Sequence, residues 1–278
     1  MDKRLIFPAI AAAAAGFLYF DNNALRSVTY ECSFENLPEA FDGYRIVHLS
    51  DLHGKIFGDR QKRLIRRIIS LKPDIVVSTG DMVSVNGKGL NSAALIASSL
   101  TENGIPMLYI SGNHEAWLNG YGAVKEVLTS RGCTVLDNRI YIAERGNDRI
   151  TFIGIGDQRL FRTKYTDGTE GFSLKLKQLC DYSEGFRILL SHRPHFAEFY
   201  SSLGVDLVFC GHAHGGQIRL PFVGGLYAPE QGFLPKYDSG KHEIGGMTEI
   251  ISRGLGNSSF PIRFLNRPEV SVTVLKKE

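Results

Sequence analysis

The feature that most constrains the fold of this chain is a set of five short apolar runs, each followed directly by side chains that bind metal ions. Runs of this length, rich in Ile, Val, Leu and Phe, predict buried β-strands. In a doubly wound α/β sheet, the residues just beyond the carboxyl ends of the strands line the ligand crevice. We therefore expect a two-metal site at one edge of one sheet. The runs and the ligands after them are 44–50 before Asp51 and His53, 74–79 before Asp81, 105–111 before Asn113, 186–191 before His192, and 206–210 before His212 and His214.

The residue types suit such a site. Asp51 and His53 are two residues apart, so on a strand their side chains share a face and could hold one ion. Asp81 follows the turn-forming Gly80, and its two carboxylate oxygens could bridge two cations. Asn113 offers a neutral amide oxygen. The remaining ligands are neutral imidazole nitrogens, which suit Zn, Mn, Fe or Co. They are His192, His212 and His214, of which the last two would share a face but reach different metals.

Helical patterns alternate with the apolar runs, which indicates an α/β domain. They cover 59–71, 91–100, 121–130, 173–180 and 195–203. Residues 141–155 instead predict a hairpin around Gly146 and Asn147, placed where one half of the sheet system passes to the other. Residues 270–275 predict a final strand. We divide the chain into an amino-terminal segment 1–23, a connector 24–41 and a domain 42–278.

The amino terminus has the pattern of an export signal or signal anchor. Lys3 and Arg4 precede an almost uncharged segment 5–20, and Asp21 restores polarity. Sixteen apolar residues fall just short of a typical span of about 17–25, so tilt or bilayer thinning would be needed. With Lys3 and Arg4 in the cytoplasm, the rest of the chain would lie outside. A helix buried on the domain is the alternative, and signal cleavage after the Ala11–Ala15 run is another.

Composition excludes little else. The net charge is +3 with 278 residues, and no basic block with interleaved aromatics indicates a specific nucleic-acid partner. The four cysteines show no Cys-x-x-Cys spacing, and a bridge between Cys133 and Cys180 stays open. We expect a monomer.

The five ligand blocks, in this order, resemble the signature of calcineurin-like metallophosphoesterases. The resemblance covers about residues 45–275, and the stretches 211–221 and 252–268 look like a bacterial, membrane-associated subgroup of phosphodiesterases. It implies a β-sandwich of mixed sheets flanked by helices (αββα), with an apolar amino-terminal helix. It also implies two divalent ions, Mn, Zn, Fe or Co, that act through a bridging hydroxide.

By that resemblance, two ligand sets share Asp81. One metal would take Asp51, His53, Asp81 and His214, and the other Asp81, Asn113, His192 and His212. His114 lies beside Asn113 but outside both sets, so it is the candidate catalytic acid. Glu115 is expected to support the ligands rather than bind metal. Asp157 and Arg159, just after the strand 151–156, are candidate substrate-binding residues, whereas His48 and His195 are expected to be structural.

Three functions fit this sequence. The first is an exported phosphodiesterase or pyrophosphatase acting on an envelope or lipid-linked substrate, held to the outer face of the cell membrane by a single span. The second is a phosphomonoesterase acting on nucleotides or proteins, and the third a non-catalytic scaffold. We find no Arg within the ligand blocks to neutralise the extra charge of a monoester, and Arg193 is expected to turn away from the metals. The apolar loop 218–234 either packs beneath the sheet or forms a lip toward the bilayer.

Overall fold

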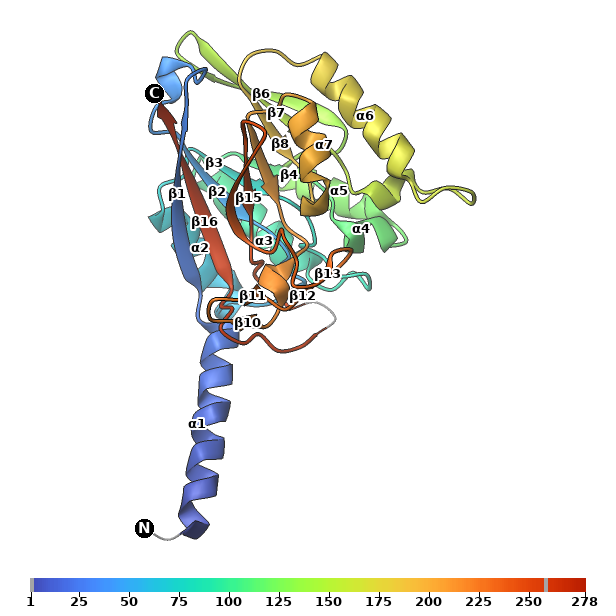
Figure 1. Ribbon diagram of the computed structural model, residues 1–278. Coiled ribbons are helices and arrows are strands. Elements are labelled where there is room, and N and C mark those ends of the chain that lie inside the picture. The colour runs from blue at the N-terminus through green and yellow to red at the C-terminus, as the bar shows by residue number, and fades with distance from the viewer. Residues whose placement is uncertain (1–2, 258–259) are drawn as a thin grey trace.

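Two six-stranded sheets form the centre of the molecule in the computed structural model, which describes residues 3–257 and 260–278 (Figure 1). The strands of the first sheet are β1 (Arg26–Phe34), β2 (Arg45–Leu49), β3 (Ile75–Ser78), β4 (Met107–Tyr109), β5 (Thr134–Val135) and β16 (Glu269–Lys277). Those of the second are β6 (Arg139–Arg145), β7 (Asp148–Gly154), β8 (Arg187–Leu190), β9 (Leu207–Cys210), β14 (Gly240–Ile244) and β15 (Met247–Ile251). Their orders are β1-β16-β2-β3-β4-β5 and β14-β15-β9-β8-β7-β6.

Each sheet has a parallel centre. Strands β2, β3, β4 and β5 pair in parallel, as do β7, β8, β9 and β15. The antiparallel pairs are β16 with β2, β14 with β15, and β6 with β7. The carboxyl ends of parallel neighbours lie at the same edge. Each sheet therefore presents a row of strand ends, and the loops after them, on one side.

Helices cover the outer faces of both sheets, so the chain has four layers. They are α2 (Lys62–Ser70), α3 (Leu90–Glu102), α4 (Asn113–Trp117), α5 (Tyr121–Ser130), α6 (Thr169–Asp181) and α7 (Ala197–Ser202). One core cluster joins α2, α3 and α5 to the first sheet, and another joins α6 and α7 to the second. A third cluster, which includes Ile46, Val77 and Phe209, lies between the sheets. The expected αββα arrangement of mixed sheets is thus present.

The hairpin and the strand–helix alternation match the sequence pattern, but the connector does not. Strands β6 and β7 form the expected hairpin, and β6 is the first strand of the second sheet in chain order. Residues 24–41, expected to be a connector, contain the nine-residue strand β1, which pairs in parallel with β16 over its whole length. The sequence does carry the alternation of a strand, with Val28, Tyr30 and Cys32 separated by polar residues, but this stretch is not one of the continuous apolar runs. The folded unit therefore begins before Asp42.

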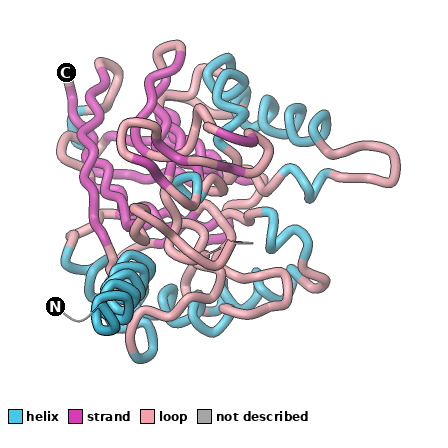
Figure 2. Tube along the Cα trace, turned by 60° about the horizontal axis from the view of Figure 1, so that its bottom comes forward, coloured by secondary structure: helices cyan, strands magenta, loops and turns pink. Residues whose placement is uncertain are grey.

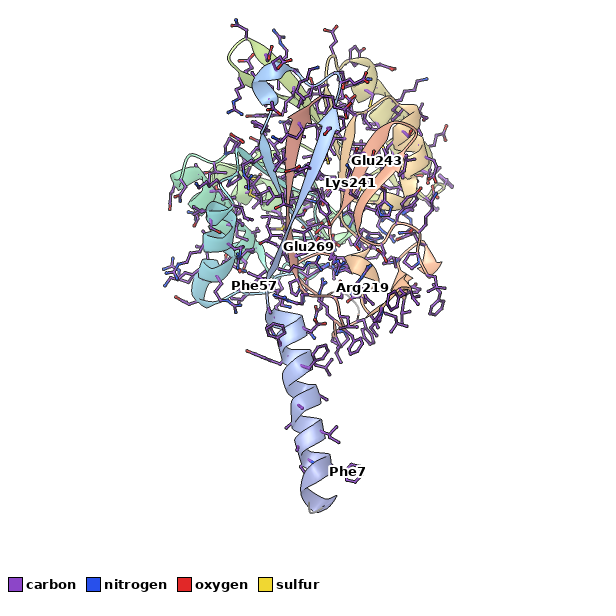
Figure 3. The ribbon with its side chains drawn as sticks, turned by 60° about the vertical axis from the view of Figure 1, so that its left-hand side comes forward. Phe7, Phe57, Arg219, Lys241, Glu243 and Glu269 are labelled. Atoms are coloured by element: carbon purple, nitrogen blue, oxygen red, sulfur yellow. The ribbon has the colours of Figure 1, made fainter. Side chains whose placement is uncertain are left out.

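Helix α1 (Lys3–Asn23) projects away from the four layers (Figure 1). Its side chains from residue 7 to residue 17 are exposed, and Phe7 lies near its free end (Figure 3). The alternative of a helix buried on the domain is therefore wrong. In the described ranges, no helix is both long enough and apolar enough to cross a membrane.

Two short hairpins lie at the same end of the molecule as the base of α1 (Figure 1). They are formed by β10 (Arg219–Leu220) with β11 (Gly224–Gly225), and by β12 (Tyr227–Ala228) with β13 (Gly232–Phe233). The apolar side chains Phe222, Phe233 and Leu234 are exposed. The loop 218–234 therefore does not pack beneath a sheet.

Candidate metal centre

The side chains predicted to bind metal lie together, but they come from two sheets rather than one. Those after β2, β3 and β4 belong to the first sheet, and those after β8 and β9 belong to the second. The expectation of a single sheet edge was wrong because the two parallel blocks pack face to face and bring their carboxyl ends together. All seven side chains are buried, namely Asp51, His53, Asp81, Asn113, His192, His212 and His214.

One group of donors is formed by Asp51, His53 and His214. The Nε2 atom of His214 lies 3.3 Å from Asp51 Oδ1 and 3.1 Å from His53 Nε2. His53 Nε2 lies 3.9 Å from Asp51 Oδ1. Two imidazole nitrogens and a carboxylate oxygen therefore converge on one point, which is the donor set for a single cation.

A second group is formed around His192. Its Nε2 atom lies 3.5 Å from Asp81 Oδ2, 3.1 Å from Asn113 Oδ1 and 3.1 Å from His212 Nδ1. These four residues are the second set that the resemblance implies, and the structure brings them together.

Asp81 lies between the two groups. Its Oδ2 atom is 3.7 Å from His53 Nε2 and 3.5 Å from His192 Nε2, and so it faces both. Its Oδ1 atom accepts a hydrogen bond of 2.8 Å from the backbone N–H of His114. The Asp81 carboxylate therefore lies where it could contact both cations, as expected of a bridging residue.

Five of the seven residues have left-handed backbone conformations. Their φ angles are 52° at Asp51, 47° at His53, 52° at Asp81, 66° at His212 and 49° at His214. Left-handed non-glycine residues cost roughly 1–3 kcal/mol each and cluster at functional sites. Strand alternation was thus the wrong reason for the Asp-x-His and His-x-His pairs. The strands end at Leu49 and Cys210, and tight turns aim the side chains instead.

Glycines allow these turns to approach one another. A Cβ atom on Gly211 would lie 1.9 Å from Ser50 Oγ and 2.5 Å from Asp51 Oδ2. A Cβ atom on Gly112 would lie 2.2 Å from Asp81 Oδ1. Both distances are far below van der Waals contact. Only glycine at 211 lets the loop after β9 meet the loop after β2 of the other sheet, and only glycine at 112 lets the loops after β3 and β4 meet.

Two buried contacts hold the ligands in place. The His192 Nδ1 atom lies 2.6 Å from the carbonyl oxygen of Thr79, which fixes the ring so that Nε2 faces the other donors. The Glu115 carboxylate accepts backbone hydrogen bonds from Asp81, Val83 and Gly112, at 2.8, 2.9 and 3.0 Å. Glu115 thus ties the loop after β3 to the loop after β4, in the supporting role expected of it.

The charges of the site favour cations. Burial disfavours a charge on His192, but the carboxylates of Asp81 and then Asp51 outweigh it and raise its pKa to about 10. Burial lowers the pKa of His214 to about 3 and also lowers that of His53. Both rings are therefore neutral at pH 7 and can bind a metal through nitrogen. A mixed set of carboxylate oxygen, amide oxygen and imidazole nitrogen fits two divalent transition metals.

His114 was expected to lie outside both ligand sets, but its side chain lies close to two of the predicted ligands. Its Nε2 atom is 3.9 Å from Asp81 Oδ2, and its ring centroid is 4.4 Å from that of His53. Its side chain is 18% exposed, whereas the His53 side chain is 4% exposed. His114 therefore faces the opening of the site, where a proton donor would meet a leaving group.

Asp157 does not face that opening. It is 1% exposed, and its carboxylate pairs with Arg193 at 2.7 Å (Nε to Oδ2). Arg193 in turn lies 2.9 Å from Glu230 (Nη1 to Oε1), and Glu230 contacts the Nε2 atom of His212. Arg193 is thus paired with two carboxylates, and no motif indicated the Arg193–Glu230 link. Glu230 lies outside every ligand block, and only the folded loop brings it to His212.

Arg159 does line the opening. Its guanidinium lies 4.0 Å from the centroid of the Trp117 ring and its Nη2 atom 3.6 Å from Glu230 Oε1. A small pocket of about 150 Å³ contains both residues and reaches Asp81, His114 and His214. Of the two candidate substrate-binding residues, the structure thus brings Arg159 to the site and pairs Asp157 with an arginine.

His48, His195 and the cysteines lie outside the donor groups. His48 is buried, with Nε2 2.8 Å from Thr79 Oγ1, and His195 lies against Phe196. Both are in structural positions, as expected. The four cysteines are free and buried, so Cys133 and Cys180 are not bridged.

Comparison with known proteins identifies the family of the chain. A profile described as calcineurin-like phosphoesterase matches residues 44–216. The uncharacterised metallophosphoesterase YkuE of Bacillus subtilis is 31% identical, over 98% of this chain and 95% of its own length. The phosphodiesterase YaeI of Escherichia coli is also 31% identical, over 84% of this chain and 82% of its own length. The structure of TT1561 from Thermus thermophilus shares the fold, with a TM-score of 0.50 at 12% identity, over 76% of this chain and 89% of that one. The chain belongs to the calcineurin-like metallophosphoesterase family, and it is a hydrolase.

Proposed function

We propose that this protein uses two divalent cations to hydrolyse phosphodiester or pyrophosphate bonds. The observation that carries the proposal is the pair of donor groups that share Asp81 Oδ2. When bound, two such cations neutralise phosphate charge and lower the pKa of the attacking water.

The residues of the chain itself supply orientation and proton transfer. Thr79 fixes the ring of His192, and Glu115 fixes the loop that carries Asp81. His114, at the opening, is placed to give a proton to the leaving oxygen. Arg159 is placed to contact the part of the substrate that enters the small pocket.

Two separate pockets support a phosphodiester, which carries a substituent on each side of its phosphorus. One is the small pocket at Arg159, and the other has a volume of about 500 Å³ and reaches His53. The name of the E. coli relative, phosphodiesterase YaeI, supports the same choice. Arg159 favours the alternative, a phosphomonoesterase, because a guanidinium there could neutralise a second phosphate charge. Its partner Glu230 already offsets that charge.

Hydrolysis of matched model esters tests the proposal. Full-length protein stripped with chelator and reloaded with Mn, Co or Zn should cleave bis-p-nitrophenyl phosphate faster than p-nitrophenyl phosphate. Faster monoester cleavage would establish the alternative. Activity that survives exhaustive chelation would refute the metal mechanism, and the absence of any cleavage would favour a scaffold.

We also propose that α1 holds the protein to the outer face of a cell membrane, where the substrate is an envelope or lipid-linked phosphate. The support is an exposed helix with apolar side chains such as Ile10 and Tyr19, 61% and 74% exposed. A helix that is apolar all round needs an apolar environment. The two short hairpins lie at the same end of the molecule as the base of α1, and Phe222 and Phe233 on them are exposed. Figure 2, in which that end comes forward, shows α1 nearly end-on beside these loops.

Protease added to intact spheroplasts tests the location. The protein should be digested together with a known outer-face marker, while a cytoplasmic marker survives. Digestion only after lysis would place the catalytic domain in the cytoplasm and refute the proposed topology.

A further inference from the structure

A groove joins the base of α1 to the metal centre. It is the pocket of about 500 Å³ that reaches His53. The helix supplies one wall, and the loops after β2, β3 and β15 supply the other. Its lining residues are Leu18, Tyr19, Asn22, Asn23, His53, Lys55, Lys88, Asn257, Pro261 and Ile262.

The polar part of this α1 groove is cationic. It contains Lys55 and Lys88 but no carboxylate. Lys55 is half-buried, and its ammonium donates to the carbonyl oxygen of Asn22 at the end of α1. Lys88 is exposed, and among the described residues its ammonium has no acidic partner within 4.0 Å. The groove thus holds uncompensated positive charge beside a metal ligand, which suits an anion.

The rest of the groove is apolar. Leu18 and Tyr19 line it from α1, and Pro261 and Ile262 line it from the facing loop. The apolar surface continues beyond the groove along the exposed side chains of the helix, such as Phe7. A ligand with a charged head and an apolar chain therefore matches the order of side chains, from His53 outward.

The base of α1 is fixed firmly enough to form a binding wall. Asn22 makes hydrogen bonds with both backbone groups of Arg263, at 2.9 and 3.0 Å. The Asp21 carboxylate accepts from the backbone N–H of Asn266 at 3.1 Å, and the Asn266 side chain donates to the carbonyl oxygen of His214 at 2.7 Å. The segment 252–268, singled out in the sequence, thus connects the helix to a predicted metal ligand.

We propose that the α1 groove is a second substrate-binding subsite. It binds an additional anionic group of the phosphate ester through Lys55 and Lys88, and the apolar chain of that substrate along Leu18 and Tyr19. This inference rests on the function proposed above, and it makes α1 a part of the substrate site as well as an anchor.

Calorimetric binding to the full-length, Mn-loaded protein in nonionic detergent tests the subsite without catalysis. The probes are octyl methylenediphosphonate, its butyl analogue and octylphosphonate, none of which is hydrolysed. Replacing Lys88 by Ala should weaken the binding of octyl methylenediphosphonate about tenfold, which is the size of a lost charge-assisted contact. It should weaken the binding of octylphosphonate much less. Replacing Tyr19 by Ala should reduce the advantage of octyl over butyl roughly threefold, because less apolar surface is covered.

Matched variants separate the subsite from general effects. Lys177→Ala and Tyr182→Ala replace an exposed lysine and a 76% exposed tyrosine remote from the groove lining, and should bind every probe like the wild type. Equal binding of the diphosphonate by Lys88→Ala and wild type would overturn the inference. So would an effect of Lys177→Ala as large as that of Lys88→Ala. Hydrolysis of bis-p-nitrophenyl phosphate is read separately. Hydrolysis without these binding differences would support the hydrolase function and refute the subsite. Binding differences without hydrolysis would support the subsite and refute the hydrolase function.

Discussion

Metal loading should release one proton from the protein at pH 7–8, and that proton should come from His192. In the metal-free site the pKa of His192 is about 10, because the carboxylates of Asp81 and Asp51 outweigh the effect of burial. A protonated imidazole cannot bind a cation, so the proton must leave when the metal binds. His53 and His214 are neutral at this pH because burial lowers their pKa values, and they should release none.

The direction and size of the pH dependence of metal affinity follow from the raised pKa of His192. Below pH 10 the apparent affinity for the cation beside His192 should rise about tenfold per pH unit, so between pH 6 and 9 it should rise about 10³-fold. The stability of the metal-free protein should change in the opposite direction. The charge on His192 stabilises the metal-free fold fully below its ordinary pKa of 6.5, and this contribution is lost as the pH rises through about 10. A pKa difference of this size corresponds to on the order of 5 kcal/mol.

Titration calorimetry of the metal-free protein with Mn, in buffers of different ionisation enthalpy, measures the proton count directly. The slope of the logarithm of affinity against pH measures it independently. Release of no proton, or a slope near zero, would show that His192 is neutral before binding and would refute the electrostatic reasoning. A second released proton would come from the attacking water, whose pKa two bound cations lower, and release of more than two would show that His53 or His214 is charged as well.

The remaining predictions concern single side chains. Asp81→Ala should reduce bound metal below two per chain and abolish activity. His114→Ala should keep both metals and lose about 10²–10⁴-fold in rate, with a smaller loss for substrates that have good leaving groups. Equal metal loss in the two variants, measured by elemental analysis, would show that His114 is a ligand. Glu115→Gln should lower the free energy of unfolding by about 1–3 kcal/mol and weaken metal binding, because an amide N–H₂ then faces backbone donors; unchanged urea unfolding would contradict this. Gly211→Ala should disrupt metal binding, because its Cβ meets the loop after β2, whereas Gly122→Ala on α5 has no atom within 4 Å of the new Cβ and should leave metal content unchanged. A Gly211→Ala protein with full metal content would show that the two loops can separate freely.

Much of the site could be predicted because metal ligands at strand ends are a local pattern. The short run before His192 and the run before His212 each identify a strand and the ligand just beyond its end. The pattern does not say which sheet a strand joins. The ligands were therefore assigned to one sheet edge, although β8 and β9 lie in a different sheet from β2. Strand β1 has the local alternation of a strand, but its partner could not be predicted, since its pairing with β16 joins residues more than two hundred positions apart.

Contacts between distant loops could not be predicted at all, and they change the role of the amino-terminal segment. No predicted ligand precedes Asp51, so the sequence alone gives residues 1–23 no role at the metal centre. In the structure, Asp21 and Asn22 bind the segment that supports His214. Removal of residues 1–16 should therefore preserve metal affinity, because Asp21 and Asn22 remain. Removal of residues 1–23 should weaken it. Equal metal affinity of the two truncated proteins would show that the helix only anchors the enzyme, and that the support of His214 lies within the domain.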